Sequence, residues 1–358
     1  MTAPADATAS EASGKRRLRK RDLIRRGALL LITGVALYIL APGLIEVFSS
    51  WERVREMQPG WLALAVLLEL ASFACLWILQ KLAIRARRIV PVITSQLAGN
   101  AFGRIVPGGG AAAAAFQFGM LRRAGVPSGN IATGLTAVHL LTFGTLLALP
   151  ILAIPAVLNA TNVDDSLVRG VWIALGALVV LFAVGALFLA TDGPLRWVGR
   201  VVQKVRNWIM RRREAMSGLP DRLIDERNLI RTTIGDRWWE ALLTSIGRWG
   251  FDFGVLLAVI AALGASPSAS LVLLAYVVAN LAGMIPITPG GLGFVEAGLT
   301  STLVLAGVSA GDAVVITFGY RLISFWLPLP FGGLAMLLHK RFIGDLPPAE
   351  VEGSGSAA

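Results

Sequence analysis

Long apolar runs separated by short clusters of charged residues dominate the sequence. An apolar run of about 18 residues or more is long enough to cross a bilayer as a helix. Six runs reach that length, at about 27–48, 61–80, 128–154, 171–190, 239–263 and 312–338. This pattern predicts an all-α fold, that of a polytopic helical membrane protein whose chain crosses the bilayer several times.

Two further apolar stretches, at about 92–120 and 271–306, are interrupted by helix-breaking residues. Each contains Asn-x-x-Gly followed by Pro-Gly-Gly, and the second copy has two extra residues before this triplet: Asn100, Gly103, Pro107, Gly108 and Gly109; Asn280, Gly283, Pro289, Gly290 and Gly291. Proline removes a backbone donor and glycine permits positive φ. Paired interruptions in two halves of a chain are typical of broken helices beside a substrate path. We call residues 107–109 the first break and residues 289–291 the second break, and predict that each stretch forms a re-entrant hairpin of two short helices.

The basic residues lie in blocks between the apolar runs. Because cytoplasmic loops carry the excess of Lys and Arg, we predict a cell-membrane protein with both termini in the cytoplasm and cytoplasmic blocks at 15–26, 81–88, 122–123, 194–237 and 339–341. The first hairpin then enters from the cytoplasmic side. The second has no flanking basic residue and is predicted to enter from outside. The two halves would therefore form an inverted repeat.

The apolar runs are predicted to form a single transmembrane domain over residues 27–340. Its first half covers about 61–190 and its second half about 238–340. Residues 1–26 are expected to be a disordered basic cytoplasmic tail, and residues 341–358 a second disordered tail.

The connector between the halves, at about 194–237, is rich in arginine. Apolar residues recur in it at three- and four-residue spacing: Leu195, Val198, Val202, Val205 and Ile209. This spacing is typical of an amphipathic helix that lies on the anionic inner leaflet. A solvated connector is the alternative.

Composition narrows the classes of function. Charged residues make up 15% of the chain and hydrophobic residues 55%, whereas a soluble domain has about 25% charged residues. The net charge of +11 lies in loop blocks with no zinc spacing and no interleaved aromatics, so we expect no nucleic acid partner. The single cysteine, Cys75, cannot form an internal disulfide. The sequence has no phosphate-binding Gly-Lys-Ser/Thr loop, no metal cluster and no catalytic motif, which predicts no cofactor, no metal and no enzyme activity.

Charged side chains inside apolar helices are costly and are therefore candidates for function. Arg104, Glu296 and Arg321 have no local partner in the sequence, so we predict that they line one polar cavity. An arginine in such a cavity could hold a phosphate through paired hydrogen bonds. The predicted translocation site also includes Tyr320, Asn100, Asn280, Pro107, Gly108, Gly109, Pro289, Gly290 and Gly291.

Three secondary candidates have simpler alternatives. Asp252 lies four residues after Arg248 on the same helix face, and an internal ion pair is the favoured interpretation. Glu69 lies in the middle of its run, and the sequence does not choose between packing and function. His139 is alone in its run; a buried histidine with a hydrogen-bond partner is the simpler interpretation, and a proton-coupled role is the alternative.

Three motifs point to a known family: Gly-Arg104-x-x-Pro-Gly-Gly, Pro289-Gly-Gly-Leu-Gly-x-x-Glu296 and Gly-Tyr320-Arg321-x-x-x-Phe-Trp-x-Pro328. The chain resembles the lysylphosphatidylglycerol synthase transmembrane-region family, also called flippase-like integral membrane proteins. In its best-known members, a similar domain moves aminoacylated phosphatidylglycerol between leaflets and is fused to a soluble aminoacyl transferase domain. This chain departs from them by lacking that domain, so it is not expected to make the lipid.

The resemblance implies a lipid translocase that works without ATP hydrolysis on an anionic, aminoacylated or glycosylated head group. Its partner would be a membrane phospholipid or a polyprenyl-linked lipid, with a homo-oligomer left open. Other hypotheses are a secondary transporter of a small polar solute, a lipid-head-group transferase using Glu296, Glu69 or Asp252, and a non-transporting assembly subunit. Gradient-driven uptake would identify the transporter, and product formation by the purified protein would identify the transferase.

Overall fold

The computed structural model describes residues 57–106, 109–153, 190–209, 235–284 and 288–343, with scattered residues between 176 and 228. These residues belong to one compact unit, Glu46–Ala358, and every element among them is helical. Several predictions lie outside the described residues: the tail at 1–26, the first span at about 27–48, most of the fourth span at about 171–190, Pro107 and Gly108 of the first break, and residues 344–358 of the last tail.

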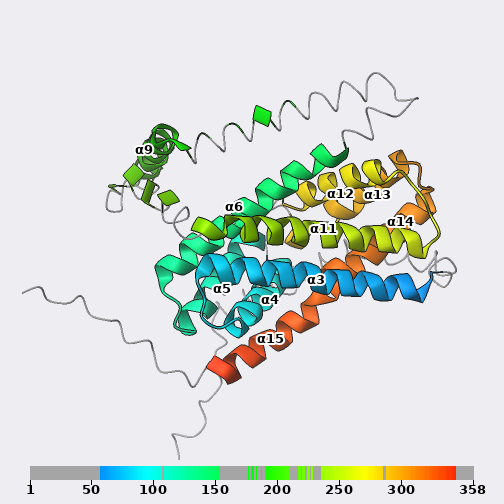
Figure 1. The fold of residues 1–358 in the computed structure, drawn as a ribbon, viewed down its shortest axis with the longest axis horizontal. Helices are drawn as coiled ribbons and strands as arrows, with labels where there is room; N and C mark the ends of the chain where they lie inside the picture. Colours follow the sequence, from blue (N-terminus) through cyan, green and yellow to red (C-terminus); the bar gives the residue numbers. More distant parts are fainter. Residues whose placement is uncertain are drawn as a thin grey trace, which may run out of the picture. The chain divides into compact units, whose positions relative to one another are not determined.

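Two long helices, α3 (Pro59–Ile84) and α11 (Trp238–Ala262), pack side by side along most of their length (Figure 1). Their boundaries agree closely with the second and fifth predicted spans. On α3, the polar side chain of Glu69 is buried at 5% exposure, whereas Leu67 is 62% exposed. A helix that buries its polar groups and exposes its leucines is suited to a lipid environment, because the bilayer core accepts apolar side chains and not charges.

The first interrupted stretch forms two short helices that pack against each other, α4 (Val90–Ile105) and α5 (Gly109–Arg123). A helix of 16 residues is about 24 Å long, which is less than the roughly 30 Å of a bilayer core. The chain then continues into α6 (Ser128–Ala148) and a 3₁₀ turn, η1 (Leu149–Ala153), close to the end predicted for the third span.

The second interrupted stretch has the same order of elements. Helix α12 (Ala269–Gly283) packs against α13 (Phe294–Leu305), and the second break between them forms a 3₁₀ turn, η3 (Pro289–Gly291). Gly290 has φ +61°, and a Cβ there would lie 2.4 Å from the ring of Phe325. Only glycine fits this backbone conformation and this close approach.

The predicted last span is divided into three parts. Helix α14 (Ala310–Arg321) continues into a π-helical segment, η4 (Leu322–Trp326), and then into α15 (Pro328–Ile343). Pro328 supplies no N–H to the carbonyl of Ser324 four residues earlier, which explains why the α-helical hydrogen bonding stops here. Because α15 extends to Ile343, the first residues of the predicted C-terminal tail are helical.

Helix α15 joins the second half of the chain to the first broken pair (Figure 1). It packs along α4 so closely that a Cβ at Gly332 would lie 2.4 Å from the Cβ of Ala101. His339 near its end contacts Thr94 Oγ1 on α4 at 2.8 Å and the Met120 carbonyl on α5 at 3.2 Å. The two halves are therefore interlocked.

The arginine-rich connector contains one described helix, α9 (Asp192–Ile209), which covers the predicted amphipathic repeat. Trp197, Val201 and Val202 are exposed on it. The helix itself is confirmed, and its contact with the inner leaflet stays a prediction.

Four described helical segments are long and apolar enough to cross a membrane: Pro59–Ile84, Ser128–Leu152, Trp238–Ala262 and Ala310–His339. The predicted class is confirmed, and the chain is an all-α, multi-pass membrane protein. The order of long helix, broken pair and long helix is the same in both halves. The inverted relation of the halves, and the entry of the broken pairs into the membrane, stay predictions.

Candidate functional site

A polar cavity of about 110 Å³ lies among the two central helices, both broken pairs and the last span. This volume holds about three water molecules. Its polar and charged lining residues are Glu69, Ser72, Asn100, Arg104, Arg248, Asp252, Asn280, Tyr320, Arg321 and Ser324. The cavity therefore brings together predicted site residues that are distant in the sequence; Glu69 and Arg321, for example, are 252 positions apart.

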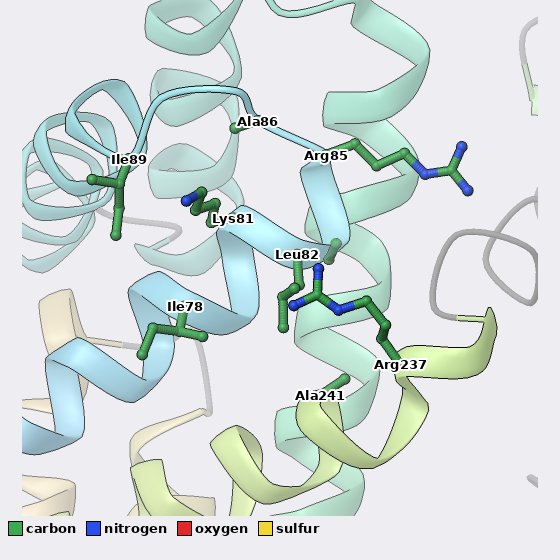
Figure 2. Close-up of a pocket in the computed structure, with 9 residues that line it drawn as sticks. Ile78, Lys81, Leu82, Arg85, Ala86, Ile89, Arg237 and Ala241 are labelled. Atoms are coloured by element: carbon green, nitrogen blue, oxygen red, sulfur yellow. The ribbon is translucent and has the colours of Figure 1, made fainter.

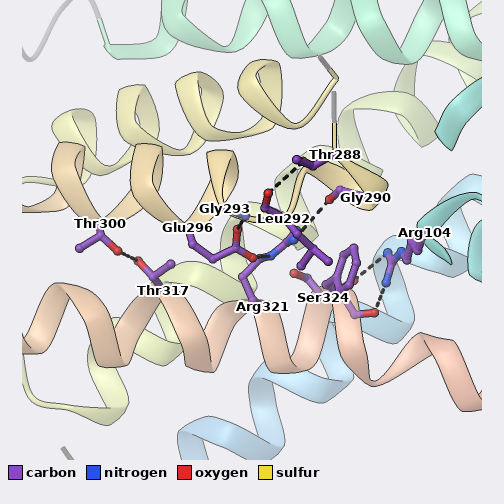
Figure 3. A network of polar contacts seen from close by, with 11 residues as sticks. Arg104, Thr288, Gly290, Leu292, Gly293, Glu296, Thr300, Thr317, Arg321 and Ser324 are labelled. Carbon is purple, nitrogen blue, oxygen red and sulfur yellow. Dashed lines mark hydrogen bonds and ion pairs between the residues drawn. The ribbon is translucent and has the colours of Figure 1, made fainter. Parts of the chain in front are cut away.

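Arg104 lies in the last turn of α4, just before the first break. Its guanidinium donates one hydrogen bond to the carbonyl of Ser324 at 2.9 Å and another to the carbonyl of Phe325 (Figure 3). It also lies 4.7 Å from the centroid of the Phe325 ring. Both carbonyls belong to the π-helical segment, so Arg104 satisfies backbone groups that the irregular helix leaves available.

Arg321 connects the last span to the second break. Its Nε donates to Glu296 Oε1 at 2.6 Å, and its second terminal nitrogen, Nη2, donates to the Gly290 carbonyl at 3.3 Å (Figure 3). Glu296 Oε2 accepts a hydrogen bond from the Gly293 N–H at 2.7 Å, at the start of α13. Glu296 is therefore the counter-ion of Arg321. Arg321 lines the cavity, whereas Glu296 does not.

Asp252 on α11 accepts hydrogen bonds from two tyrosine hydroxyls. Tyr320 on α14 donates to its Oδ2 at 2.8 Å, and Tyr276 on α12 donates to the same oxygen. Sequence reasoning identified Tyr320 and missed Tyr276, which sits within an uninterrupted apolar run and is completely buried. The two tyrosine hydroxyls therefore satisfy Asp252 Oδ2 in an apolar environment.

Two charged side chains in the cavity have unsatisfied atoms. Oε2 of Glu69 and Nη1 of Arg248 are buried and have no hydrogen-bond partner. The guanidinium of Arg248 lies 4.1 Å from the centroid of the Trp249 ring. Asp252 accepts its hydrogen bonds from the two tyrosines, and Nη1 of Arg248 remains available to donate to a ligand. The simple Arg248–Asp252 ion pair favoured from the sequence is therefore not found among the described residues.

Asn100 and Asn280, the matched asparagines of the two interrupted stretches, both line the cavity. The amide of Asn280 donates to the Tyr276 carbonyl at 2.9 Å on its own helix. In the second break (Pro289, Gly290 and Gly291), the Gly290 carbonyl accepts a hydrogen bond from Arg321, which lines the cavity. In the first break, the described residue Gly109 is the first residue of α5. The structure therefore places the described residues of both matched motifs at one site.

His139 is not part of this site. It is exposed on α6, and its Nδ1 lies 2.6 Å from the Leu135 carbonyl of the same helix. The interpretation as a buried histidine is wrong, because that face of α6 points away from the described helices. Within the described parts of the chain, no group of three or more His, Cys, Asp or Glu residues could hold a metal ion.

A second pocket, of about 490 Å³, lies at the end of α3 and the start of α11 (Figure 2). Its wall combines apolar residues such as Ile78 and Leu82 with three basic ones, Lys81, Arg85 and Arg237. None of the sequence-predicted site residues lines it. It is therefore a separate feature from the polar cavity.

The fold and the cavity define the class of this protein as a multi-pass helical membrane protein with a buried, charged cavity at two interrupted helices. The sequence profile of the family described as the lysylphosphatidylglycerol synthase TM region matches residues 28–332, and the chain belongs to this family.

Two curated relatives are membrane proteins as well. A UPF0104 membrane protein of Methanothermobacter thermautotrophicus is 28% identical over 335 residues, which cover 87% of this chain and 95% of that protein. A UPF0104 membrane protein of Pyrococcus horikoshii is 31% identical over 102 residues, which cover 28% of this chain and 30% of that protein. The family relates the chain to membrane lipid metabolism or transport.

Proposed function

We propose that the chain is a lipid translocase that moves an anionic head group between leaflets without ATP hydrolysis. The observation that supports this best is the buried cavity in which Nη1 of Arg248 and Oε2 of Glu69 lack partners. A buried unsatisfied charge is costly, so both atoms are suited to a polar ligand. Their position beside both interrupted helices fits a substrate path.

In this proposal, the phosphate of the head group first meets Arg248. Arg104 and Arg321 then exchange their contacts with backbone carbonyls for contacts with the phosphate, since a guanidinium can bind it through paired hydrogen bonds. The acyl chains remain in the lipid phase. Moving a charge through the bilayer core is the main barrier, and a cavity with three arginines lowers that barrier. No chemical step is assigned to any residue, so the proposed protein is not an enzyme.

The proposed setting is the cell membrane with both termini in the cytoplasm. The two broken pairs would enter from opposite sides and meet at the cavity, as in an inverted repeat. Helix α9, with its exposed Trp197 and its basic side chains, would lie on the anionic inner leaflet. The substrate would then be a phospholipid or a polyprenyl-linked lipid drawn from one leaflet.

The test is a translocation assay in vesicles that contain fluorescent phosphatidylglycerol, with quenching of the outer leaflet as readout. We expect Arg104→Ala to be at least about tenfold slower than the parent, since a hydrogen bond to a charged group is worth roughly 1.5–3 kcal/mol. Arg237→Ala is the matched control, because Arg237 is exposed and lies outside the cavity; it should keep the parent rate. An Arg104→Ala variant as fast as the parent would exclude this site.

The size of the cavity also accepts a small polar solute, which makes secondary transport the second candidate. A parallel assay measures uptake of radiolabelled inorganic phosphate into the same vesicles. It distinguishes transport of a free anion from translocation of a lipid head group. Uptake of phosphate without movement of the lipid would replace the lipid proposal by solute transport.

A further inference from the structure

The charges around the polar cavity balance. Three arginines, Arg104, Arg248 and Arg321, meet three carboxylates among the described residues, Glu69, Asp252 and Glu296. With all six groups ionised, the cluster is neutral. Neutrality matters here because a net charge in a low-dielectric cavity inside a membrane is strongly unfavourable.

The three carboxylates differ in how they are satisfied. Asp252 accepts hydrogen bonds from two tyrosine hydroxyls, and Glu296 has both Arg321 and the Gly293 N–H. Glu69 is 5% exposed, and its Oε2 has no hydrogen-bond partner. Glu69 is therefore the carboxylate whose charge the surrounding structure stabilises least.

An anionic head group that enters this cavity adds a negative charge to a neutral cluster. We propose that Glu69 takes up one proton when such a head group binds, so that each anionic lipid is carried together with one proton. This inference rests on the proposed lipid translocation. It adds the coupling ion and names the residue that binds it.

The exchange is balanced in charge and in atoms. On the side to which the cavity is open, the Glu69 carboxylate takes a proton from water and becomes a neutral carboxylic acid, while the head-group phosphate replaces its negative charge. Nη1 of Arg248, which has no hydrogen-bond partner in the empty cavity, binds the phosphate when the cavity is loaded. On the other side, the lipid leaves and the proton returns to water.

The groups that face Glu69 come from several elements. Arg248 and Asp252 belong to α11, Arg104 to α4, and Tyr320 and Arg321 to α14. Helix α6, which also packs against α3, contributes no side chain to the cavity. An anionic head group that enters the cavity changes the balance between these cations and anions.

The experiment measures binding of dioctanoyl phosphatidylglycerol to the detergent-solubilised full chain, by tryptophan fluorescence, between pH 5.5 and 8.5. Uptake of one proton on binding makes the parent's affinity fall about tenfold per pH unit at the alkaline end. Glu69→Gln mimics the protonated acid, so its affinity should not depend on pH. The matched control, Glu240→Gln, lies outside the cavity and should keep the slope of the parent.

A second measurement uses only the parent protein. In weakly buffered solution with a pH indicator, saturating lipid should remove about one proton per protein from the medium. If the parent binds and translocates the lipid with no pH dependence and no proton uptake, proton coupling is wrong and translocation stands. If the parent neither binds nor translocates the lipid, both proposals fail.

Discussion

At the scale of single residues, Phe325 is the side chain on which the two interrupted stretches converge. The guanidiniums of Arg104 and Arg321 lie 4.7 Å and 4.1 Å from its ring centroid. A cation over an aromatic face is worth roughly 0.5–2 kcal/mol, and more where water is excluded. Since Arg104 precedes the first break and Arg321 contacts the second, this arrangement links both breaks to the last span.

The Arg321–Glu296 ion pair is expected to stabilise the fold. Arg321→Ala leaves the half-buried Glu296 with one backbone donor. Because breaking a fully buried pair costs about 3–5 kcal/mol, we expect a smaller cost for this partly buried pair. We expect a clear decrease in the apparent Tm of the purified protein, followed by tryptophan fluorescence.

The exposed pair Arg237–Glu240 provides the matched control for this prediction. Arg237→Ala also removes an arginine from an ion pair, but this pair is exposed to solvent, where screening makes ion pairs weak. It should therefore change the Tm little. Equal Tm values for Arg321→Ala and the parent would contradict a stabilising role of the Arg321–Glu296 pair.

At the scale of elements, the last span is interrupted by a π-helical segment. Its π-helical segment presents the carbonyls of Ser324 and Phe325 to Arg104, and Pro328 prevents the α-helical bond that would otherwise engage Ser324. Irregular backbone at membrane depth persists only where protein or a wet cavity satisfies it. The position of this segment at the cavity fits a hinge whose carbonyls release Arg104 when the head group enters.

Replacing the proline tests this hinge. Pro328→Ala restores an N–H that can bond the Ser324 carbonyl, and proline in a helix interior costs about 3 kcal/mol relative to alanine. We expect equal or higher thermal stability together with slower translocation of fluorescent phosphatidylglycerol.

The control for the hinge is Pro91→Ala in the first turn of α4, where no N–H is required. It should change neither stability nor rate. A Pro328→Ala variant that loses stability and keeps the parent rate would exclude the hinge.

At the scale of the whole molecule, the two halves share the same order of elements and also pack against each other. Helix α15 packs along α4 of the first half, and α3 packs along α11 of the second. The cavity receives side chains from both halves, so neither half can form it alone. Any movement that opens the cavity must therefore displace one set of helices against the other.

The predicted orientation can be tested by cysteine labelling in a Cys75→Ser background. Ser128 is the exposed first residue of α6, and Ser268 is exposed directly before α12. Each is replaced by cysteine in turn. The charge pattern predicts that Ser128 lies on the cytoplasmic side and Ser268 on the outside. A membrane-impermeant maleimide should label Ser268→Cys in intact cells and Ser128→Cys only after permeabilisation; labelling of both in intact cells would overturn this topology.

The sequence by itself determined the class, the described spans and the positions of the two breaks. Apolar run length and helix-breaking residues are local properties, and the bilayer thickness converts them directly into helices. The sequence also identified Arg104, Arg321 and Glu296 as candidates, because a charge within an apolar run is conspicuous wherever it lies.

Only the tertiary structure decided which groups meet. The acceptors of Arg104 are backbone carbonyls 220 and 221 residues away, and Tyr276 gives no signal in the sequence because a tyrosine in an apolar run is ordinary core. The unsatisfied Oε2 of Glu69 likewise follows from which side chains of the neighbouring helices reach it. Such pairings arise from packing between distant helices, which side-chain patterns along one helix do not specify.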